Sequence, residues 1–178
     1  RGKGPSRDRA GRQLVWVHRL SIELFRVDER LIHGQVVIGW GHQVRPDRYV
    51  VVDDELASSE WEQDLYRLGA GTADILFVDT AGAVSRIAEW CDDEPRTILL
   101  TRDVTTMCRL GDSGALRDQS VNLGGIHHGP GRREVLTYLH LTEAEMDDLR
   151  ALEAGGAKVT ARDLPDAREA PLSQLVGR

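Results

Sequence analysis

Short apolar runs alternate with longer amphipathic segments along most of the chain, beginning at Ile22. Several of these runs are hydrophobic on both faces, which is typical of strands in a buried parallel sheet. The runs that predict strands are IELFRV (22–27), RYVVVD (48–53), DILFVD (74–79), TILLT (97–101) and SVNLGGI (120–126). Residues 136–141 and 157–164 are weaker strand candidates, better suited to the edge of a sheet.

Helix signals lie between these runs. Two segments have the Ser/Thr-x-x-Glu spacing of a capping box, followed by an apolar stripe on one face and then a glycine. They are Ser59 and Glu62 before Trp61, Leu65, Leu68 and Gly69, and Thr142 and Glu145 before Met146, Leu149, Leu152 and Gly155. Further helices are predicted over 34–44, which Pro46 ends, and over 81–91.

This alternation of strands and helices predicts the fold class. It is the βαβ signature, and 178 residues suit one domain with a sizeable core. We therefore predict a single α/β domain: a mainly parallel central sheet with helices on both faces, and an irregular hairpin late in the chain. Ligands of such sheets bind at the carboxyl ends of the strands, in the strand-to-helix loops.

Charge is distributed unevenly along the chain. Residues 1–20 carry six basic residues against one Asp, which gives +5 and leaves −11 on the rest of a chain of net charge −6. An acidic body lacks the clustered Lys and Arg that a duplex requires, so no nucleic-acid partner is expected. Because the first residues are rich in Gly, Arg and Pro, we predict a disordered basic leader over 1–20 and a folded domain over 21–178.

The cysteines and the hydropathy indicate the compartment. Cys91 and Cys108 are too few and too far apart for a metal site or a disulfide framework, so they are interpreted as structural thiols of a reduced compartment. No apolar run approaches the roughly 18 residues that a membrane helix needs. A cytoplasmic protein is expected, which reaches a membrane at most through a partner.

The candidate chemistry lies in RVDERLIHGQVV, residues 26–37. His33 falls between the first strand and the first helix, beside the positive end of the helix dipole, which favours anions. Arg30, in the same loop, has a planar fork that matches phosphoryl oxygens, and Gly34 permits a close approach. A neutral imidazole can also take a phosphoryl group covalently and pass it on. Spacing alone leaves open a capping or buried structural histidine, or a small-anion site without covalent chemistry.

A family resemblance bears on this choice. The segment FRVDERLIHGQVVIGW resembles the active-site segment of the IIB subunits of the mannose, fructose and sorbose family of the bacterial phosphoenolpyruvate-dependent sugar phosphotransferase system, usually Arg-Ile-Asp-Asp-Arg-Leu-Ile-His-Gly-Gln-Val. The likeness continues through RYVVVDDELA and VNLGGIHHGPGRREV and covers about Ile22 to Leu175. Val27 replaces the usual Ile, and Glu29 the second Asp, which keeps the acidic charge.

The resemblance implies the same fold, a role for each site residue, and partners. His33 would be phosphorylated through Nδ1, and Arg30 would steady the transferred group. The phosphoryl group would come from the histidine of a IIA partner and go to a sugar imported by membrane-embedded IIC and IID partners, with which the chain would associate peripherally. A homodimer is compatible with the family, and neither a metal nor another cofactor is implied. The alternative is a regulatory phosphohistidine module that delivers no sugar.

Other motifs carry less weight. The GDSG at 111–114 lacks the β-barrel context of a protease nucleophile and is interpreted as a loop that ends a helix, while GWGHQV at 39–44 lies inside a predicted helix. Adjacent His127 and His128 cannot both face one metal from a regular strand. They belong to a glycine-bounded loop whose Arg132 and Arg133 could help to dock a partner near His33.

Overall fold

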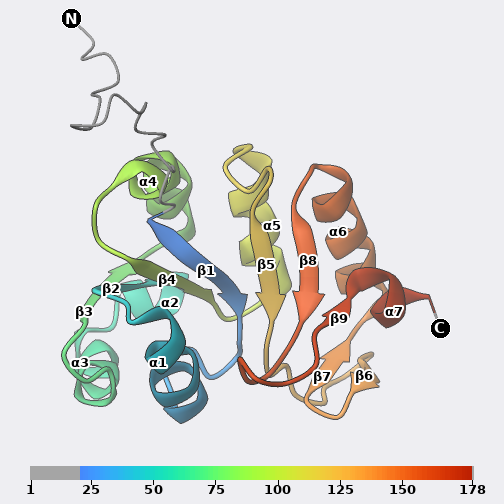
Figure 1. The fold of residues 1–178 in the computed structure, drawn as a ribbon, viewed down its shortest axis with the longest axis horizontal. Coiled ribbons are helices and arrows are strands. Elements are labelled where there is room, and N and C mark those ends of the chain that lie inside the picture. Colours follow the sequence, from blue (N-terminus) through green and yellow to red (C-terminus); the bar gives the residue numbers. More distant parts are fainter. Residues whose placement is uncertain (1–20, 178) are drawn as a thin grey trace, which may run out of the picture.

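The computed structural model describes residues 21–177, so the leader predicted over 1–20 lies outside the described residues. A seven-stranded sheet forms the centre, in the order β3-β2-β4-β1-β5-β8-β9, and all neighbouring strands are parallel except β8 and β9 (Figure 1). The strands are β1 (Ile22–Val27), β2 (Arg48–Val52), β3 (Asp74–Val78), β4 (Thr97–Thr101), β5 (Ser120–Leu123), β8 (Lys158–Ala161) and β9 (Ala170–Pro171). A separate antiparallel hairpin consists of β6 (Arg133–Leu136) and β7 (Leu139–Leu141).

Helices cover both faces of the sheet, and each face has its own hydrophobic core. On one face lie the π-helix η1 (Gln35–Trp40), α1 (Gly41–Val44), α2 (Asp54–Ala57) and α3 (Glu60–Gly69), around Val36, Trp40, Tyr49 and Leu56. The other face carries α4 (Thr80–Asp92), α5 (Val104–Asp112), α6 (Glu143–Ala154) and α7 (Leu172–Val176), around Ile87, Trp90, Met107 and Leu149. The predicted single α/β domain is confirmed. Within the described residues, no helix is long and apolar enough to cross a membrane.

The five main strands form where the apolar runs predicted them. The last of these stops at Leu123, short of the predicted end at 126, because the chain turns at Gly124 against the first strand. A Cβ atom at Gly124 would collide with the guanidinium of Arg26, so glycine is required there. The predicted late hairpin is also present, as β6 and β7, but the candidate strand at 136–141 is wrong in its extent, because residues 137–138 form the turn between them.

The weak candidate at 157–164 is more central than predicted. Its strand, β8, pairs with β5 on one side and with the short β9 on the other, so β8 is not an edge strand. Antiparallel β9 was missed because its two residues, Ala170 and Pro171, carry no strand periodicity.

The helix predicted over 34–44 is helical throughout but is not regular. Gln35–Trp40 form a π-helix, and only Gly41–Val44 are α-helical, ending at Arg45 in the left-handed region (φ 51°) just before Pro46. Three β-branched residues followed by two glycines within three positions are poor α-helix formers, which fits a widened turn. Single π-helical turns are frequent at functional sites.

The two predicted capping boxes have different outcomes. Thr142 and Glu145 form theirs, with both reciprocal hydrogen bonds present at the start of α6. Ser59 precedes α3 as predicted, but its side chain makes no capping hydrogen bond, so the prediction of a capping box there is wrong. The Gln63 side chain instead ties α3 to the end of α2, donating to the carbonyl oxygens of Leu56 and Ala57 at 2.9 and 3.1 Å.

Candidate functional site

The loops that follow β1, β4 and β5 meet at one edge of the sheet, toward which the arrowheads of β1 and β5 point in Figure 1. The Asp28 amide donates to the carbonyl oxygen of Thr101, the last residue of β4, and the Glu29 amide donates to that of Gly125, just after β5, both at 2.9 Å. From β1 the chain passes to η1 on one face, and from β5 it passes to α6 on the other. The two loops therefore flank a switch point of the topology, where open α/β sheets bind ligands.

A fully buried ion pair, Arg26 with Asp28, lies beneath this edge. Asp28 Oδ2 accepts from Arg26 Nη2 at 2.8 Å and Nε at 3.2 Å, and from the Gly125 amide at 3.2 Å. Burial lowers the pKa of Arg26, and the Asp28 carboxylate opposes that shift. Because a buried charge is costly unless it is paired, Arg26 fixes Asp28 in place, and the hydrogen bond from the Gly125 amide to Asp28 joins the β1 and β5 loops.

His33 and Arg30 meet through the side chain of Gln35. Arg30 Nη2 donates to Gln35 Oε1, and the same oxygen lies 3.3 Å from His33 Nε2. The His33 side chain is 15% exposed and that of Arg30 is 45% exposed, so the imidazole is sheltered while the guanidinium reaches solvent. Asp28 supports the pair from below: Oδ1 accepts from the Arg30 amide at 3.2 Å, and Oδ2 lies 3.9 Å from His33 Nε2.

Both ring nitrogens of His33 face oxygen acceptors. His33 Nδ1 lies 3.0 Å from the carbonyl oxygen of Leu31, a residue with φ of 52°, and Nε2 faces Gln35. A carbonyl oxygen only accepts, so the shorter contact places a proton on Nδ1. For Nδ1 to act as a nucleophile, as the family resemblance implies, the proton must move to Nε2 or to solvent and the ring must turn away from the Leu31 carbonyl oxygen.

The space beside the imidazole is open at Gly34. A Cβ atom built there meets nothing within 4 Å, and Gly34 has helical dihedral angles (φ −51°, ψ −42°) as the N-cap of η1. The first turn closes on the His33 carbonyl oxygen, which accepts from the amides of Val36 and Val37 at 2.9 Å. The structure thus places the predicted trio of Arg30, His33 and Gly34 together at the start of the helix.

The loop that contains His127 is tied to the His33 loop through Glu29. The His127 amide and Nδ1 lie 3.0 and 2.9 Å from Glu29 Oε2, and Arg132 pairs with Glu29 Oε1 and, at 3.0 Å, with Glu145. Burial alone would raise the pKa of Glu29, but the hydrogen bonds from His127 and Arg132 outweigh it and lower the pKa. Two carboxylates thus engage Arg132, and Arg133 pairs with Glu143 at 3.2 Å.

Three contributors to this site were not predicted: Gln35, the buried Arg26–Asp28 pair, and Arg102. Arg102 follows β4 and bonds Asp53 at 2.6 Å and the Glu29 carbonyl oxygen at 3.2 Å, so it braces the His33 loop from the adjacent strand. Gln35 lies two residues after His33 and was available to sequence reasoning. Arg102 was not, because only the strand order brings it beside β1.

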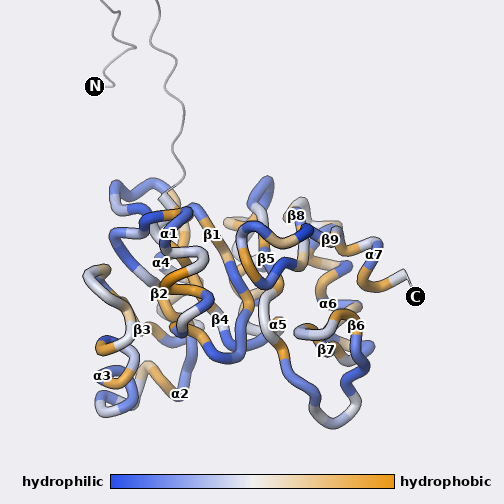
Figure 2. The backbone as a smooth tube through the Cα atoms, turned by 60° about the horizontal axis from the view of Figure 1, so that its bottom comes forward, coloured by the Kyte–Doolittle hydropathy of each residue, from blue (hydrophilic) through white to orange (hydrophobic). Residues whose placement is uncertain are grey.

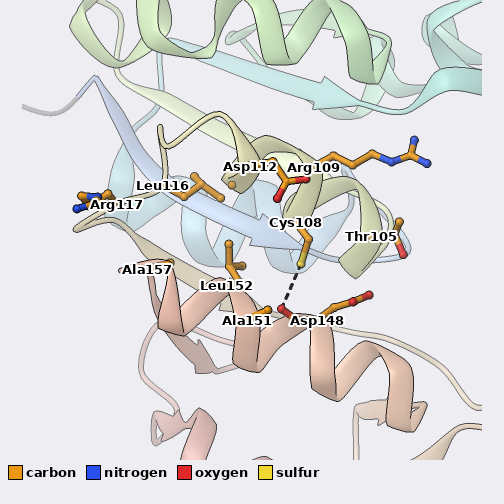
Figure 3. Close-up of a pocket in the computed structure, with 12 residues that line it drawn as sticks. Thr105, Cys108, Arg109, Asp112, Leu116, Arg117, Asp148, Ala151, Leu152 and Ala157 are labelled. Atoms are coloured by element: carbon orange, nitrogen blue, oxygen red, sulfur yellow. Dashed lines mark hydrogen bonds between the residues drawn. The ribbon is translucent and has the colours of Figure 1, made fainter.

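A pocket of about 330 Å³ lies away from this site, between α5 and α6 on the face of the sheet opposite η1 (Figure 3). Its cysteine, Cys108, has a pKa raised to about 12 by burial and by the nearby carboxylates of Asp148, Asp112 and Asp103. The thiol donates to the Asp148 carbonyl oxygen at 3.7 Å. A thiol with this pKa is no nucleophile at neutral pH, which agrees with a structural role. The predicted loop GDSG closes α5 beside this pocket.

Comparison with known proteins connects this architecture to a family. The fold matches the crystal structure of manxB from Thermoanaerobacter tengcongensis with a TM-score of 0.79 and 28% identity, covering 88% of this chain and 95% of that one. A family model described as the PTS system sorbose subfamily IIB component matches residues 22–178. The chain belongs to this family of phosphotransferase-system IIB components.

Individual relatives differ in the sugar that their names carry. The N-acetylgalactosamine-specific phosphotransferase enzyme IIB component 1 of Escherichia coli K12 is 29% identical over 82% of this chain and 92% of its own length. The mannose-specific EIIAB component of the same strain is 28% identical over 88% of this chain but only 49% of its own length. Relatives at similar identity thus carry different sugar names, and the chain is assigned to a sugar phosphotransferase system without a named sugar.

Proposed function

We propose that this chain is a phosphoryl carrier in which His33 accepts a phosphoryl group from the histidine of a IIA partner and passes it to a sugar. The observation that carries the proposal is the cluster of His33, Gln35 and Arg30 at the carboxyl edge of the sheet. It unites a nucleophile, a cation with solvent access and an open approach past Gly34. The mannose-specific EIIAB relative, whose name joins A and B components, supports a IIA donor.

In the proposed first step, a nitrogen of His33 attacks the phosphorus atom of phosphorylated IIA. One N–P bond forms on His33 as the N–P bond to the donor histidine breaks, so the step requires neither a metal ion nor a nucleotide. Phosphoryl transfer asks the protein mainly for position and for charge stabilisation. The Arg30 guanidinium supplies both, since its planar fork can hold two phosphoryl oxygens.

The buried ion pair has a part in this chemistry. A carboxylate 3.9 Å from His33 Nε2 would repel an incoming phosphoryl group, but Asp28 is neutralised by Arg26 at 2.8 Å. The loop therefore keeps a rigid acceptor of hydrogen bonds without a net negative charge beneath the site. In the second step, the oxygen of a sugar hydroxyl bonds to phosphorus as the N–P bond on His33 breaks, and the hydroxyl proton passes to the freed imidazole or to water. The sugar is presented by membrane-embedded IIC and IID partners on the cytoplasmic side.

Reconstitution tests this function. The chain is combined with the general phosphotransferase proteins, phosphoenolpyruvate, a cognate IIA and membrane vesicles that carry the cognate IIC and IID subunits. Formation of sugar phosphate that requires the chain is the expected result. Uptake of phosphate by the chain without sugar phosphate, for every sugar tested, would contradict transport and support the regulatory alternative.

A further inference from the structure

Helix α3 presents its hydrophobic residues to solvent. Trp61, Leu65 and Leu68, predicted from their spacing to form one helix face, are 67, 59 and 84% exposed, and no residue of α3 is buried. The helix is held to the rest of the domain by Gln63, which bonds the end of α2, and by Tyr66, whose ring lies 6.3 Å from that of Phe77. Figure 2 shows these hydrophobic segments on α3 at the margin of the molecule.

This apolar stripe, Trp61, Leu65 and Leu68, borders the active-site loop. A groove of about 360 Å³ lies beside it, and its lining joins Leu65 and Tyr66 of α3 to Ile32 of the His33 loop. Ile32 is the residue immediately before His33. A partner seated on the stripe would therefore also reach the loop that carries the reactive imidazole.

The rim of the stripe is acidic. Residues 54–68 contain five carboxylate side chains and one basic residue, Arg67. Arg67 is paired with Asp64 at 2.8 Å. Glu60 and Asp64 are exposed on α3 itself, and Asp54 and Glu55 are exposed on the preceding α2. The surface thus combines an apolar centre with a negative border.

That charge selects among possible occupants. A second copy of the chain would bring two acidic rims together, and an anionic bilayer attracts amphipathic helices with basic polar faces. Phosphorylated IIA would approach with a negative phosphoryl group of its own. The cytoplasmic loops of membrane proteins, in contrast, carry an excess of Lys and Arg.

We infer that the stripe on α3 docks the basic cytoplasmic face of the membrane-embedded sugar-binding partner, an inference that rests on the function proposed above. Apolar contact through Trp61, Leu65 and Leu68 fixes the position, and the acidic rim steers the encounter. Aromatic anchors at the centre of an interface with a complementary charged rim are the usual arrangement of binding hot spots. Docking there leaves His33 at the border of the contact, within reach of the bound sugar.

The test uses the full chain with the variant Trp61→Ser/Leu65→Ser/Leu68→Ser, and the single Leu68→Ser in case the triple variant fails to fold. Val84→Ser, which also removes an exposed aliphatic side chain but on α4, is the matched control. Three quantities are measured: the rate of phosphoryl uptake from IIA, the rate of sugar phosphorylation with vesicles that contain IIC and IID, and co-sedimentation of the unphosphorylated chain with those vesicles and with lipid-only vesicles.

The triple variant should take up phosphate from IIA at the wild-type rate, while sugar phosphorylation and co-sedimentation with the IIC/IID vesicles fall at least about tenfold. Glu60→Lys should weaken the same binding, and Glu89→Lys on α4 should not. Unchanged delivery by the folded triple variant overturns the inference. So does an equal loss of uptake from IIA, which would assign the stripe to the donor, or retention on lipid-only vesicles, which would assign it to the bilayer. A wild-type chain that binds the IIC/IID vesicles but takes up no phosphate overturns the proposed function and leaves the docking surface supported.

Discussion

Gln35 is the residue that joins His33 to Arg30, and its carboxamide oxygen contacts both side chains. The bridge holds the guanidinium beside the imidazole before any phosphoryl group arrives. A donor held in this way is worth more than a mobile one, because little reorganisation is needed during transfer. The partly exposed Arg30 can then exchange the carboxamide for phosphoryl oxygens.

Arg30→Lys tests this arrangement. We expect a folded protein whose phosphoryl transfer is slowed on the order of 10- to 1000-fold, because a point charge replaces a fork that can hold two oxygens at once. Rapid-quench measurement of uptake from IIA gives the rate, and circular dichroism checks the fold. Unchanged rates in the folded variant would remove Arg30 from the site.

Gly34→Ala separates folding from function. Gly34 already has helical dihedral angles, and a Cβ atom there meets nothing in the isolated chain. The free energy of unfolding should rise by about 0.4–1 kcal/mol, because Ala fits these dihedral angles and restricts the unfolded chain more than Gly does. If a partner occupies that open space, transfer from IIA should slow despite the gain in stability. A folded variant that takes up phosphate at the wild-type rate would show that no partner occupies this space.

At the next level, Glu29 ties the loop after β1 to the loop after β5. Its pKa is lowered from an ordinary 4.5 by hydrogen bonds from His127 and Arg132, against the opposing effect of burial. A lowered pKa in the folded state means that the carboxylate stabilises the fold fully above about pH 4.5, and that this contribution is lost as the pH falls through the lowered value.

At pH 7 the free energy of unfolding of the Glu29→Gln variant should therefore be lower than that of the wild type by about 1–3 kcal/mol. The difference should shrink as the pH is lowered from 5 to 3, because the wild type loses the charge that the variant lacks throughout. Urea unfolding at several pH values measures both effects. A difference that stays constant across this range would show that the charge of Glu29 does not stabilise the fold.

Two helix starts with the same sequence signal differ in structure, and they form a matched pair. Thr142 caps α6 through its side chain, whereas Ser59 makes no such bond at α3. Thr142→Ala should lower the free energy of unfolding by about 1 kcal/mol, and Ser59→Ala should change it by less than about 0.5 kcal/mol. Chemical denaturation of both variants decides the point, and equal losses would mean that Ser59 also caps its helix in solution.

The elements that were predicted well are those whose signal is local. Runs such as TILLT specify a buried strand by themselves, and the Thr142 capping box is read from four residues. The stripe on α3 shows the limit of the same reasoning, since periodicity gives the apolar face of a helix but not whether the domain covers it. The π-helical turn at Gln35–Trp40 was missed, because its β-branched residues and glycines weaken an α-helix without specifying which wider turn replaces it.

For the molecule as a whole, topology explains why the site lies where it does. The motif at 26–37 was enough to place Arg30, His33 and Gly34 at one corner, but Arg102, Gly125 and Arg132 come from distant parts of the chain. The strand order puts β1 between β4 and β5, and so gathers their loops around the first one. Periodicity alone does not supply that order, because the two neighbours of β1 in the sheet, β4 and β5, are far from it in the chain.

The central claim is that His33 alone carries the phosphoryl group, and the chemistry of the label tests it directly. The chain is incubated with the general phosphotransferase proteins, a cognate IIA and phosphoenolpyruvate. A phosphoramidate on imidazole is labile in acid and survives alkali, whereas a phosphoserine ester does the reverse. We predict one acid-labile phosphate per chain, abolished by His33→Gln and retained in the control variants His42→Gln, His127→Gln, His128→Gln and His140→Gln. Label that persists in a folded His33→Gln protein, or that resists acid, would contradict the account.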